Sequence, residues 1–162
     1  MEANSIHKLS IEGISGDVIS FADYQGKKIL IINVASECGY TPQYAQLQEL
    51  YEEFKDQLVI IACPCNDFGG QEPGNHQAIQ SFCERIYGIT FPLSKKVNIL
   101  KSPVDPLYQW LTQKQNNGVL DANISWNFNK FLINEEGILM AHFPSSVSPF
   151  DDAILGQFTP LN

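Results

Sequence analysis

Cysteine has the widest reactive chemistry of the residue types in this chain, and one of its four copies stands apart by position. Cys38 follows the apolar segment 28–34 and precedes a helix start marked by Thr41 and Pro42. A thiol near a helix N-terminus meets free backbone N–H groups and their partial positive charge, which favour the thiolate. The sequence therefore predicts a nucleophile at Cys38, and a small buried hydrophobe is the alternative interpretation.

No histidine in the sequence is an evident partner for this thiol. His7, His76 and His142 fall in an expected hairpin, at an expected helix start and in a late strand. The neighbouring Glu37 carries a negative charge, which opposes a second one beside it. A thiolate at Cys38 would therefore depend on neutral hydrogen-bond donors such as carboxamides and an indole N–H.

Two segments are dense in such donors. Residues 66–74 read NDFGGQEPG, and residues 126–132 read WNFNKFL. Turn glycines in the first and a core aromatic residue in the second are the simpler explanations of these compositions. Because the second segment opens a predicted strand, Trp126 and Asn127 are expected beside the strand end that carries Cys38.

Strands and helices alternate along the chain in a way that would bring these segments together. Two apolar runs predict buried strands, and a helix between them implies a parallel pair with a right-handed crossover. Further helices and a late hairpin follow from helical spacing, caps and turn residues. The expected elements are a hairpin over 6–22, strands 28–34 and 58–62, helices after Pro42, over 75–87 and from 105, a hairpin 128–133/138–143 and a helix near 150–155.

This order predicts an α/β thioredoxin-like fold, with a central mixed β-sheet flanked by helices and an N-terminal β-hairpin. Residues 1–162 are expected to form a single domain. The apolar face of helix 75–87 is expected to include Ile79, Phe82, Cys83 and Ile86.

Composition excludes several classes of function. Hydrophobic residues make up 44% of the chain and charged ones 17%, as in a packed globule. A net charge of -8 argues against nucleic acid and against anionic membrane as partners. The first residues resemble neither a signal peptide nor an anchor, and four cysteines without such a signal predict a reducing, cytoplasmic location.

Three motifs, in order, resemble the glutathione peroxidase family over nearly the full length. Residues 33–41 (NVASECGYT) resemble its active-site segment, with cysteine where some members carry selenocysteine. Residues 64–74 resemble its second signature, and Trp126-Asn127-Phe128 with residues 130–132 resembles its third. The resemblance implies a catalytic tetrad of Cys38, Gln71, Trp126 and Asn127.

The sequence departs from the family pattern at two positions near these motifs. Asp67 stands where the family usually has Gln, and it is expected to add negative charge close to the site. Cys63 stands where an aromatic residue is common. Neither position belongs to the implied tetrad.

The resemblance also implies an activity. Members reduce hydrogen peroxide and organic hydroperoxides to water and alcohols through a cysteine sulfenic acid, here on Cys38, without a cofactor or metal. Residues 82–88 resemble the segment in which thioredoxin-dependent members carry a resolving cysteine, which implies that role for Cys83. Its place on an apolar helix stripe instead indicates a core residue. Thioredoxin is expected as reductant, with glutathione second, and the short stretch 112–125 favours a monomer.

Two other functions fit parts of the sequence. A non-catalytic or metal-carrying thioredoxin-like module would use Cys63, Cys65 and His76, although one Cys-x-Cys pair is weak evidence for a metal. A thiol-disulfide oxidoreductase would need Cys-x-x-Cys at the helix start, and residues 39–41 supply no second cysteine.

Overall fold

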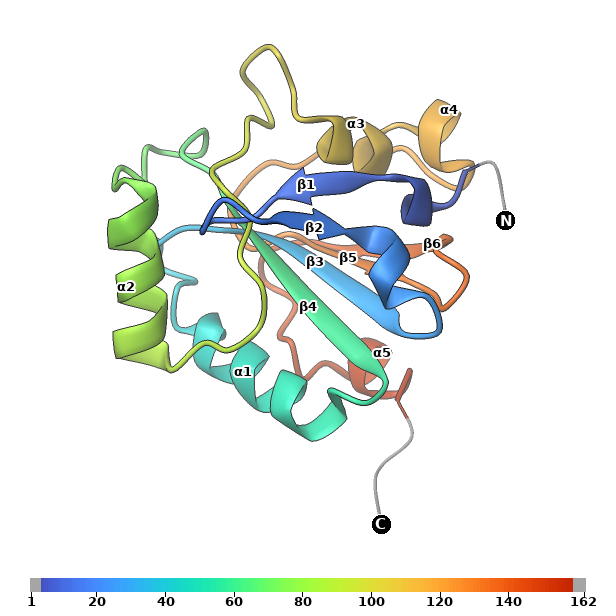
Figure 1. Cartoon of the computed structure of the whole chain (residues 1–162), viewed down its shortest axis with the longest axis horizontal. Coiled ribbons are helices and arrows are strands. Elements are labelled where there is room, and N and C mark those ends of the chain that lie inside the picture. The colour runs from blue at the N-terminus through green and yellow to red at the C-terminus, as the bar shows by residue number, and fades with distance from the viewer. Residues whose placement is uncertain (1–3, 159–162) are drawn as a thin grey trace.

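A four-stranded mixed sheet forms the centre of the protein, and the computed structural model describes it together with the rest of residues 4–158 (Figure 1). β3 (Lys28–Val34) runs parallel to β4 (Leu58–Pro64) and antiparallel to β5 (Lys130–Ile133). β5 pairs in turn with β6 (Leu139–Phe143), so the strand order is β4-β3-β5-β6. All of β4 and nearly all of β3 is buried, as expected for apolar runs covered on both faces.

The crossover between the two parallel strands is α1 (Gln43–Phe54). The prediction that Thr41 caps this helix is wrong, because Pro42 occupies the cap position and makes no side-chain cap bond. The Thr41 hydroxyl instead accepts a hydrogen bond from the Cys38 N–H and donates one to the Ala35 carbonyl. Thr41 thus stabilises the loop that precedes the helix.

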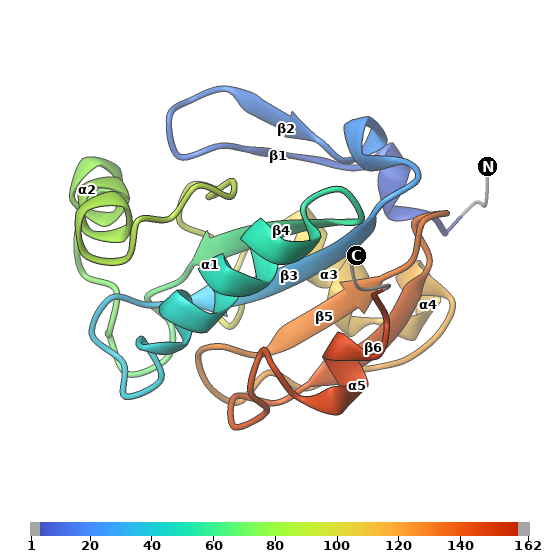
Figure 2. The same ribbon diagram turned by 90° about the horizontal axis from the view of Figure 1, so that it is seen from below.

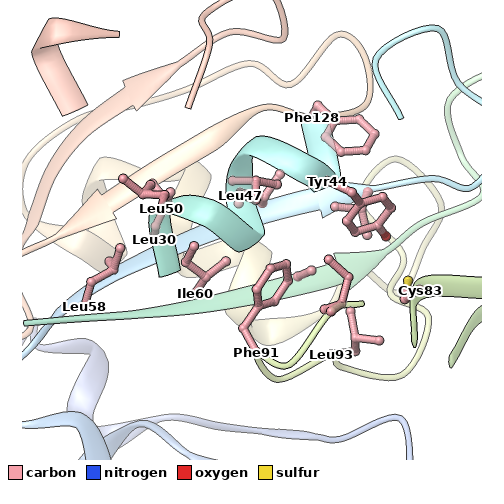
Figure 3. Close-up of a cluster of buried hydrophobic side chains, with 14 of the residues drawn as sticks. Leu30, Tyr44, Leu47, Leu50, Leu58, Ile60, Cys83, Phe91, Leu93 and Phe128 are labelled. Carbon is pink, nitrogen blue, oxygen red and sulfur yellow. The ribbon is translucent and has the colours of Figure 1, made fainter. Parts of the chain in front are cut away.

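Helices cover both faces of the sheet (Figures 1 and 2). α1 and α5 (Asp152–Leu155) lie on one face, while α3 (Pro106–Thr112) and α4 (Lys114–Asn117) lie on the other. Because side chains alternate along a strand, β3 and β4 feed two separate apolar cores. The α1 core (Leu30, Ile32, Tyr44, Leu47, Ile60 and their neighbours) is drawn in Figure 3, and the α3 core contains Ile29, Ile31, Ile61, Leu107 and Tyr108 among others.

The predicted N-terminal hairpin is present. β1 (Ser10–Glu12) pairs antiparallel with β2 (Val18–Ser20), and two short 3-10 helices, η1 (Ile6–Lys8) and η2 (Phe21–Tyr24), flank the pair. Ile11 and Phe21 pack into the α3 core, so the hairpin and α3 cover the same face of the sheet.

α2 (His76–Tyr87) lies at one end of the molecule, to the left in Figure 1. The Asn75 side chain caps its first turn by accepting from the Ala78 N–H, and Gly88 ends it in the left-handed conformation. Its buried face is narrower than predicted: Ile79 and Cys83 are buried, but Ile86 is 64% exposed. Only a thin strip of α2 meets the core, because the helix lies beyond the sheet rather than across it (Figure 1).

Three boundaries differ from the sequence-based expectation. α4 is a short helix in a stretch expected to be a loop, and β4 continues two residues beyond Ala62. β5 begins at Lys130 rather than Phe128, because Phe128 has a positive φ of 61°, which a strand cannot accommodate. Within residues 4–158, no helix is long and apolar enough to span a bilayer.

Candidate active site

Cys38 lies in the loop that joins β3 to α1, and its side chain is almost buried, with 7% exposed. The Cys38 Sγ accepts a hydrogen bond from the Tyr40 N–H at 3.3 Å. Thr41 Oγ1 holds the same turn, at 2.9 Å from the Cys38 nitrogen and 2.8 Å from the Ala35 oxygen. The loop therefore directs a backbone N–H at the sulfur, which is the kind of donor that stabilises a thiolate.

The segment after β4 folds against this loop. The Glu37 N–H donates to the Gln71 carbonyl at 3.0 Å, and the Ser36 N–H donates to Glu72 Oε1 at 3.1 Å. Gly69 has a positive φ of 72°, and a Cβ there would lie 2.7 Å from the Trp126 ring. Glycine thus lets the indole of the third motif pack directly on the turn of the second.

Asn127 joins the two donor-rich segments through its side chain. Its Nδ2 donates to Gln71 Oε1 at 3.1 Å and to the Phe68 carbonyl at 3.3 Å. Its Oδ1 is buried without a hydrogen-bond partner in the described part of the chain. A buried amide oxygen left in this state is free to accept a bond from a substrate or a bound water.

The structure thus brings Gln71, Trp126 and Asn127 together, and backbone bonds tie them to the Cys38 loop. Within the described residues, none of the three side chains forms a hydrogen bond with the Cys38 sulfur itself. Beside them a shallow pocket of about 270 Å³ opens to solvent. It is lined by Tyr40, Ser125, Trp126, Pro144, Ser145 and Ser146.

Sequence reasoning did not single out Glu72. The residue is completely buried, and its Oε2 has no hydrogen-bond partner among the described residues. Burial raises the pKa of this carboxyl, and the nearby Glu37 also raises it, although contacts with Ser36 and the charge of Lys96 act in the opposite direction. The available signal was its position beside Gln71 in the second motif.

The Asp67 carboxylate bonds to the backbone of another loop, residues 99–101. Its Oδ2 accepts hydrogen bonds from the N–H groups of Ile99, Leu100 and Lys101. Burial opposes ionisation, but these bonds outweigh it and lower the pKa of Asp67. The carboxylate therefore anchors the loop 99–101 rather than adding an unpaired negative charge to the Cys38 loop.

Cys83 is fully buried on α2 and belongs to the same apolar core as Cys38. The Tyr44 hydroxyl points toward its sulfur (Figure 3) and interacts with it. Burial raises the pKa of the Cys83 thiol to about 11, and the charge of Glu72 acts in the same direction. In the structure Cys83 is therefore a protonated thiol, and all four cysteines are free.

The residues of the metal-carrying alternative do not assemble. Cys63 and Cys65 are fully buried in the α3 core, where burial raises the pKa of each thiol to about 12. His76 Nε2 accepts a hydrogen bond from the Lys96 N–H. No group of three or more residues able to hold a metal occurs in the part of the chain that the structure describes. This donor set does not fit a metal ion.

Solved structures support the fold. The chain is similar to the crystal structure of Trgpx in apo form, with a TM-score of 0.72, 28% identity and coverage of 96% of this chain and 95% of that one. It also resembles a thioredoxin-family thiol:disulfide interchange protein from Chlorobium tepidum, with a TM-score of 0.63 at 17% identity. The predicted thioredoxin-like fold is confirmed. This fold, with a cysteine at its strand-to-helix edge and amide groups and an indole gathered on the neighbouring loops, fits the class of thiol-dependent oxidoreductases.

Sequence comparisons narrow this class. Residues 6–112 match the glutathione peroxidase family. The chain is 44% identical over 142 residues to the glutathione peroxidase-like peroxiredoxin GPX5 of Chlamydomonas reinhardtii, covering 87% of each protein. It is 42% identical over 147 residues to glutathione peroxidase-like peroxiredoxin 2 of Saccharomyces cerevisiae, covering 90% of each. The chain belongs to the glutathione peroxidase family, as its motifs predicted, and is a peroxidase.

Proposed function

We propose that the protein reduces hydrogen peroxide and organic hydroperoxides, with the Cys38 sulfur as the attacking atom. The thiolate attacks one peroxide oxygen, so that an S–O bond forms as the O–O bond breaks. The second oxygen leaves as hydroxide or alkoxide and takes up a proton to give water or an alcohol. Cys38 is then a sulfenic acid, the first oxidised state of a thiol.

The contact between Asn127 and Gln71 is the observation that carries this proposal. It joins the second motif to the third, while the bond from the Glu37 N–H to the Gln71 carbonyl joins the second to the Cys38 loop. Amide and indole N–H groups can stabilise both the thiolate and the charge that develops on the leaving oxygen, and they do not titrate near neutral pH. We assign this role to Gln71 and Trp126, and to Asn127, one of whose two amide N–H groups must leave its present acceptor, Gln71 Oε1 or the Phe68 carbonyl, to take it up.

Cys83 is proposed as the resolving cysteine. It shares the α1 core with Cys38, whereas Cys63 and Cys65 lie in the α3 core across the sheet. The Cys83 thiol would displace the sulfenic oxygen as water and form a Cys38–Cys83 disulfide. A disulfide needs Cα atoms within about 7 Å, and Cys83 faces inward from a formed helix, so α2 opens locally for this step.

The proposed opening of α2 also bears on the reductant of the protein. An opened α2 would present the disulfide to a protein such as thioredoxin, which we propose as the reductant, with glutathione second. Relatives named glutathione peroxidase-like peroxiredoxins support this choice. We further propose a monomeric single-domain protein of a reducing cytoplasm. The short stretch 112–125 supports the monomer, and a net charge of -8 argues against nucleic-acid and membrane partners.

Single-turnover oxidation of the reduced protein by hydrogen peroxide tests the role of Cys38. Cys38→Ser should abolish peroxide consumption, because serine cannot form the sulfenic acid. Gln71→Ala should slow the oxidation by about 10²- to 10³-fold, the usual cost of removing one donor to a developing anion. Stopped-flow kinetics and trapping of the sulfenic acid with a dimedone probe give the two readouts.

Asn116→Ala is the matched control for the loss of an amide, since this side chain lies on α4, where it bonds to the Gln109 carbonyl and to Gln113. It should react at the wild-type rate. Undiminished turnover by folded Cys38→Ser would refute the assignment of the nucleophile, and a wild-type rate for Gln71→Ala would remove that side chain from the site.

A further inference from the structure

A set of polar side chains, here called the polar frame, holds the backbone of residues 126–128. The proposed reaction gives these side chains no role. Four side chains, two from the next residues along the chain and two from β3 and the loop after β6, hold three successive backbone carbonyls of this segment. The Trp126 carbonyl accepts from Asn33 Nδ2 at 3.0 Å and from Asn129 Nδ2 at 2.8 Å. The Asn127 carbonyl accepts from the Ser145 hydroxyl, and the Phe128 carbonyl accepts from Lys130 Nζ at 2.7 Å.

The segment needs such support because β5 begins only after it. Phe128 is the one non-glycine residue among residues 4–158 with a positive φ. An L-residue in this conformation is strained, so its surroundings must stabilise it. Its N–H donates to the Asn33 carbonyl, and its ring packs edge-on against Tyr44 with centroids 5.5 Å apart. The direction of the preceding two side chains therefore depends on how firmly this turn is fixed.

Lys130 is the least expected member of the frame. The residue is completely buried, and its two recorded hydrogen bonds go to carbonyls, those of Phe128 and of Ser145 at 3.2 Å. The ion pairs found in the described residues involve Lys28 and Lys95, not Lys130. Burial lowers the pKa of Lys130 to about 7, because desolvation penalises the charged form. An apolar side chain at this position would not carry that desolvation cost.

Ser145 connects this lysine to the donors. Its carbonyl accepts from Lys130 Nζ, while its hydroxyl donates to the carbonyl of Asn127. Ser145 also lines the shallow pocket together with Trp126. A path of direct hydrogen bonds thus runs from the lysine through Ser145 to the backbone of Asn127, whose carboxamide meets Gln71.

We propose that Lys130 is a positioning residue of the peroxide-reducing site. Its Nζ donates hydrogen bonds to the carbonyls of Phe128 and Ser145. These bonds fix the direction of the Trp126 indole and the Asn127 carboxamide. The inference rests on the proposed function, in which these two groups are donors. Since a misplacement of about 1 Å can cost 10²-fold in rate, a frame of this kind can control reactivity without touching the substrate.

Lys130→Met keeps an unbranched side chain that is one atom shorter and removes the Nζ donors. In single-turnover measurements with hydrogen peroxide, this variant should oxidise Cys38 about 10- to 100-fold more slowly than the wild type. Asn117→Ala is the matched control, because Asn117 is a buried residue whose Nδ2 holds the Trp110 carbonyl of α3 and the Leu120 carbonyl of the segment after α4. This control should lose stability and keep the wild-type rate.

A double-mutant cycle separates positioning from a general loss of structure. If Lys130 acts through the donor segment, Lys130→Met should slow the Asn127→Ala variant much less than it slows the wild type. Fully multiplicative effects would overturn the proposal. Fluorescence of Trp126 in a Trp110→Phe background should also shift in Lys130→Met, whereas Asn117→Ala should leave it unchanged; an unshifted spectrum in Lys130→Met would count against the proposal.

Ser145→Ala tests the same connection and leaves Lys130 unchanged, so the test does not depend on whether Lys130→Met folds. It removes the hydroxyl that holds the Asn127 carbonyl and should slow the oxidation of Cys38. A wild-type rate in a folded Ser145→Ala or Lys130→Met protein would overturn this inference and leave the proposed function standing. A wild-type protein that does not consume peroxide would refute the proposed function itself.

Discussion

At the scale of single residues, one fully buried carboxyl group ties together the two loops of the site. Glu72 Oε1 holds the Ser36 N–H, two residues before Cys38, and the Glu72 N–H is held in turn by Asn66 Oδ1. Because burial raises the pKa of Glu72, the folded state keeps its proton at pH values where the unfolded chain has lost it. The folded protein then binds more protons than the unfolded one, and stability falls as pH rises through this range.

Glu72→Gln should flatten that dependence, because the amide keeps an acceptor for the Ser36 N–H and carries no charge. The free energy of unfolding of the wild type should fall relative to the variant as pH rises above the ordinary carboxyl range, by at most about 1.4 kcal/mol per pH unit. Urea unfolding between pH 5 and 8 measures the difference. Glu53→Gln, an exposed change on α1, should show no such trend. A difference independent of pH would mean that Glu72 is ionised throughout.

At the scale of elements, the predicted bounds agree with the structure where the apolar pattern and the capping residues indicate the same element. β3 has the bounds predicted from its unbroken apolar run, and α2 begins one residue after the predicted start at Asn75 and ends at Tyr87 as predicted. Phe128 was misassigned to a strand because its left-handed backbone depends on two contacts that the local sequence pattern does not reveal. Its N–H donates to the carbonyl of Asn33, which is far away in the sequence, and its carbonyl accepts from Lys130 Nζ.

The candidate site also contains residues that the sequence indicated and residues that it did not. The motifs placed Gln71 and Asn127 correctly as neighbours, since both belong to recognisable segments. Glu72 and Lys130 were missed as functional candidates because charged residues are normally exposed, and only the folded chain shows that both are completely buried. The catalytic and resolving roles themselves stay predictions.

α2 is the element whose conformation must change in the proposed cycle. Ile79 and Cys83 of this helix are buried, and Phe82 and Tyr87 pack partly buried beside them, so local opening detaches one side of the α1 core and leaves the sheet in place. Oxidation by one equivalent of peroxide should give a Cys38–Cys83 disulfide and faster amide hydrogen exchange along α2. Peptide mapping and hydrogen-exchange mass spectrometry measure the two effects.

Cys83→Ser should keep the first oxidation step but lose thioredoxin-supported turnover, because the sulfenic acid then has no internal thiol to condense with. Ser81→Gly, on the same helix, weakens α2 without removing a thiol and should keep thioredoxin-supported turnover. Wild-type turnover of Cys83→Ser with thioredoxin would make Cys83 a core residue and leave resolution to another thiol.

At the scale of the whole molecule, the sheet divides the four thiols between two cores. Cys38 and Cys83 pack on the α1 side, and Cys63 and Cys65 pack on the α3 side. The second pair lies among polar groups of its own: Cys63 interacts with Ser94 and Tyr108, and Cys65 with Asp67. With the pKa of each thiol raised to about 12, both stay protonated at neutral pH and are poor nucleophiles.

A Cys63→Ala/Cys65→Ala double variant should therefore keep wild-type turnover with peroxide and thioredoxin, while its free energy of unfolding falls by about 1–3 kcal/mol from the lost burial of two sulfur atoms. Steady-state turnover and urea unfolding test the two halves of this expectation. Since the lost burial lies on the α3 face and the proposed cycle uses thiols on the α1 face, stability and activity should change separately in this variant. If the folded double variant lost thioredoxin-supported turnover, a thiol of the α3 core would take part in the cycle, and the division of labour between the two faces would be wrong.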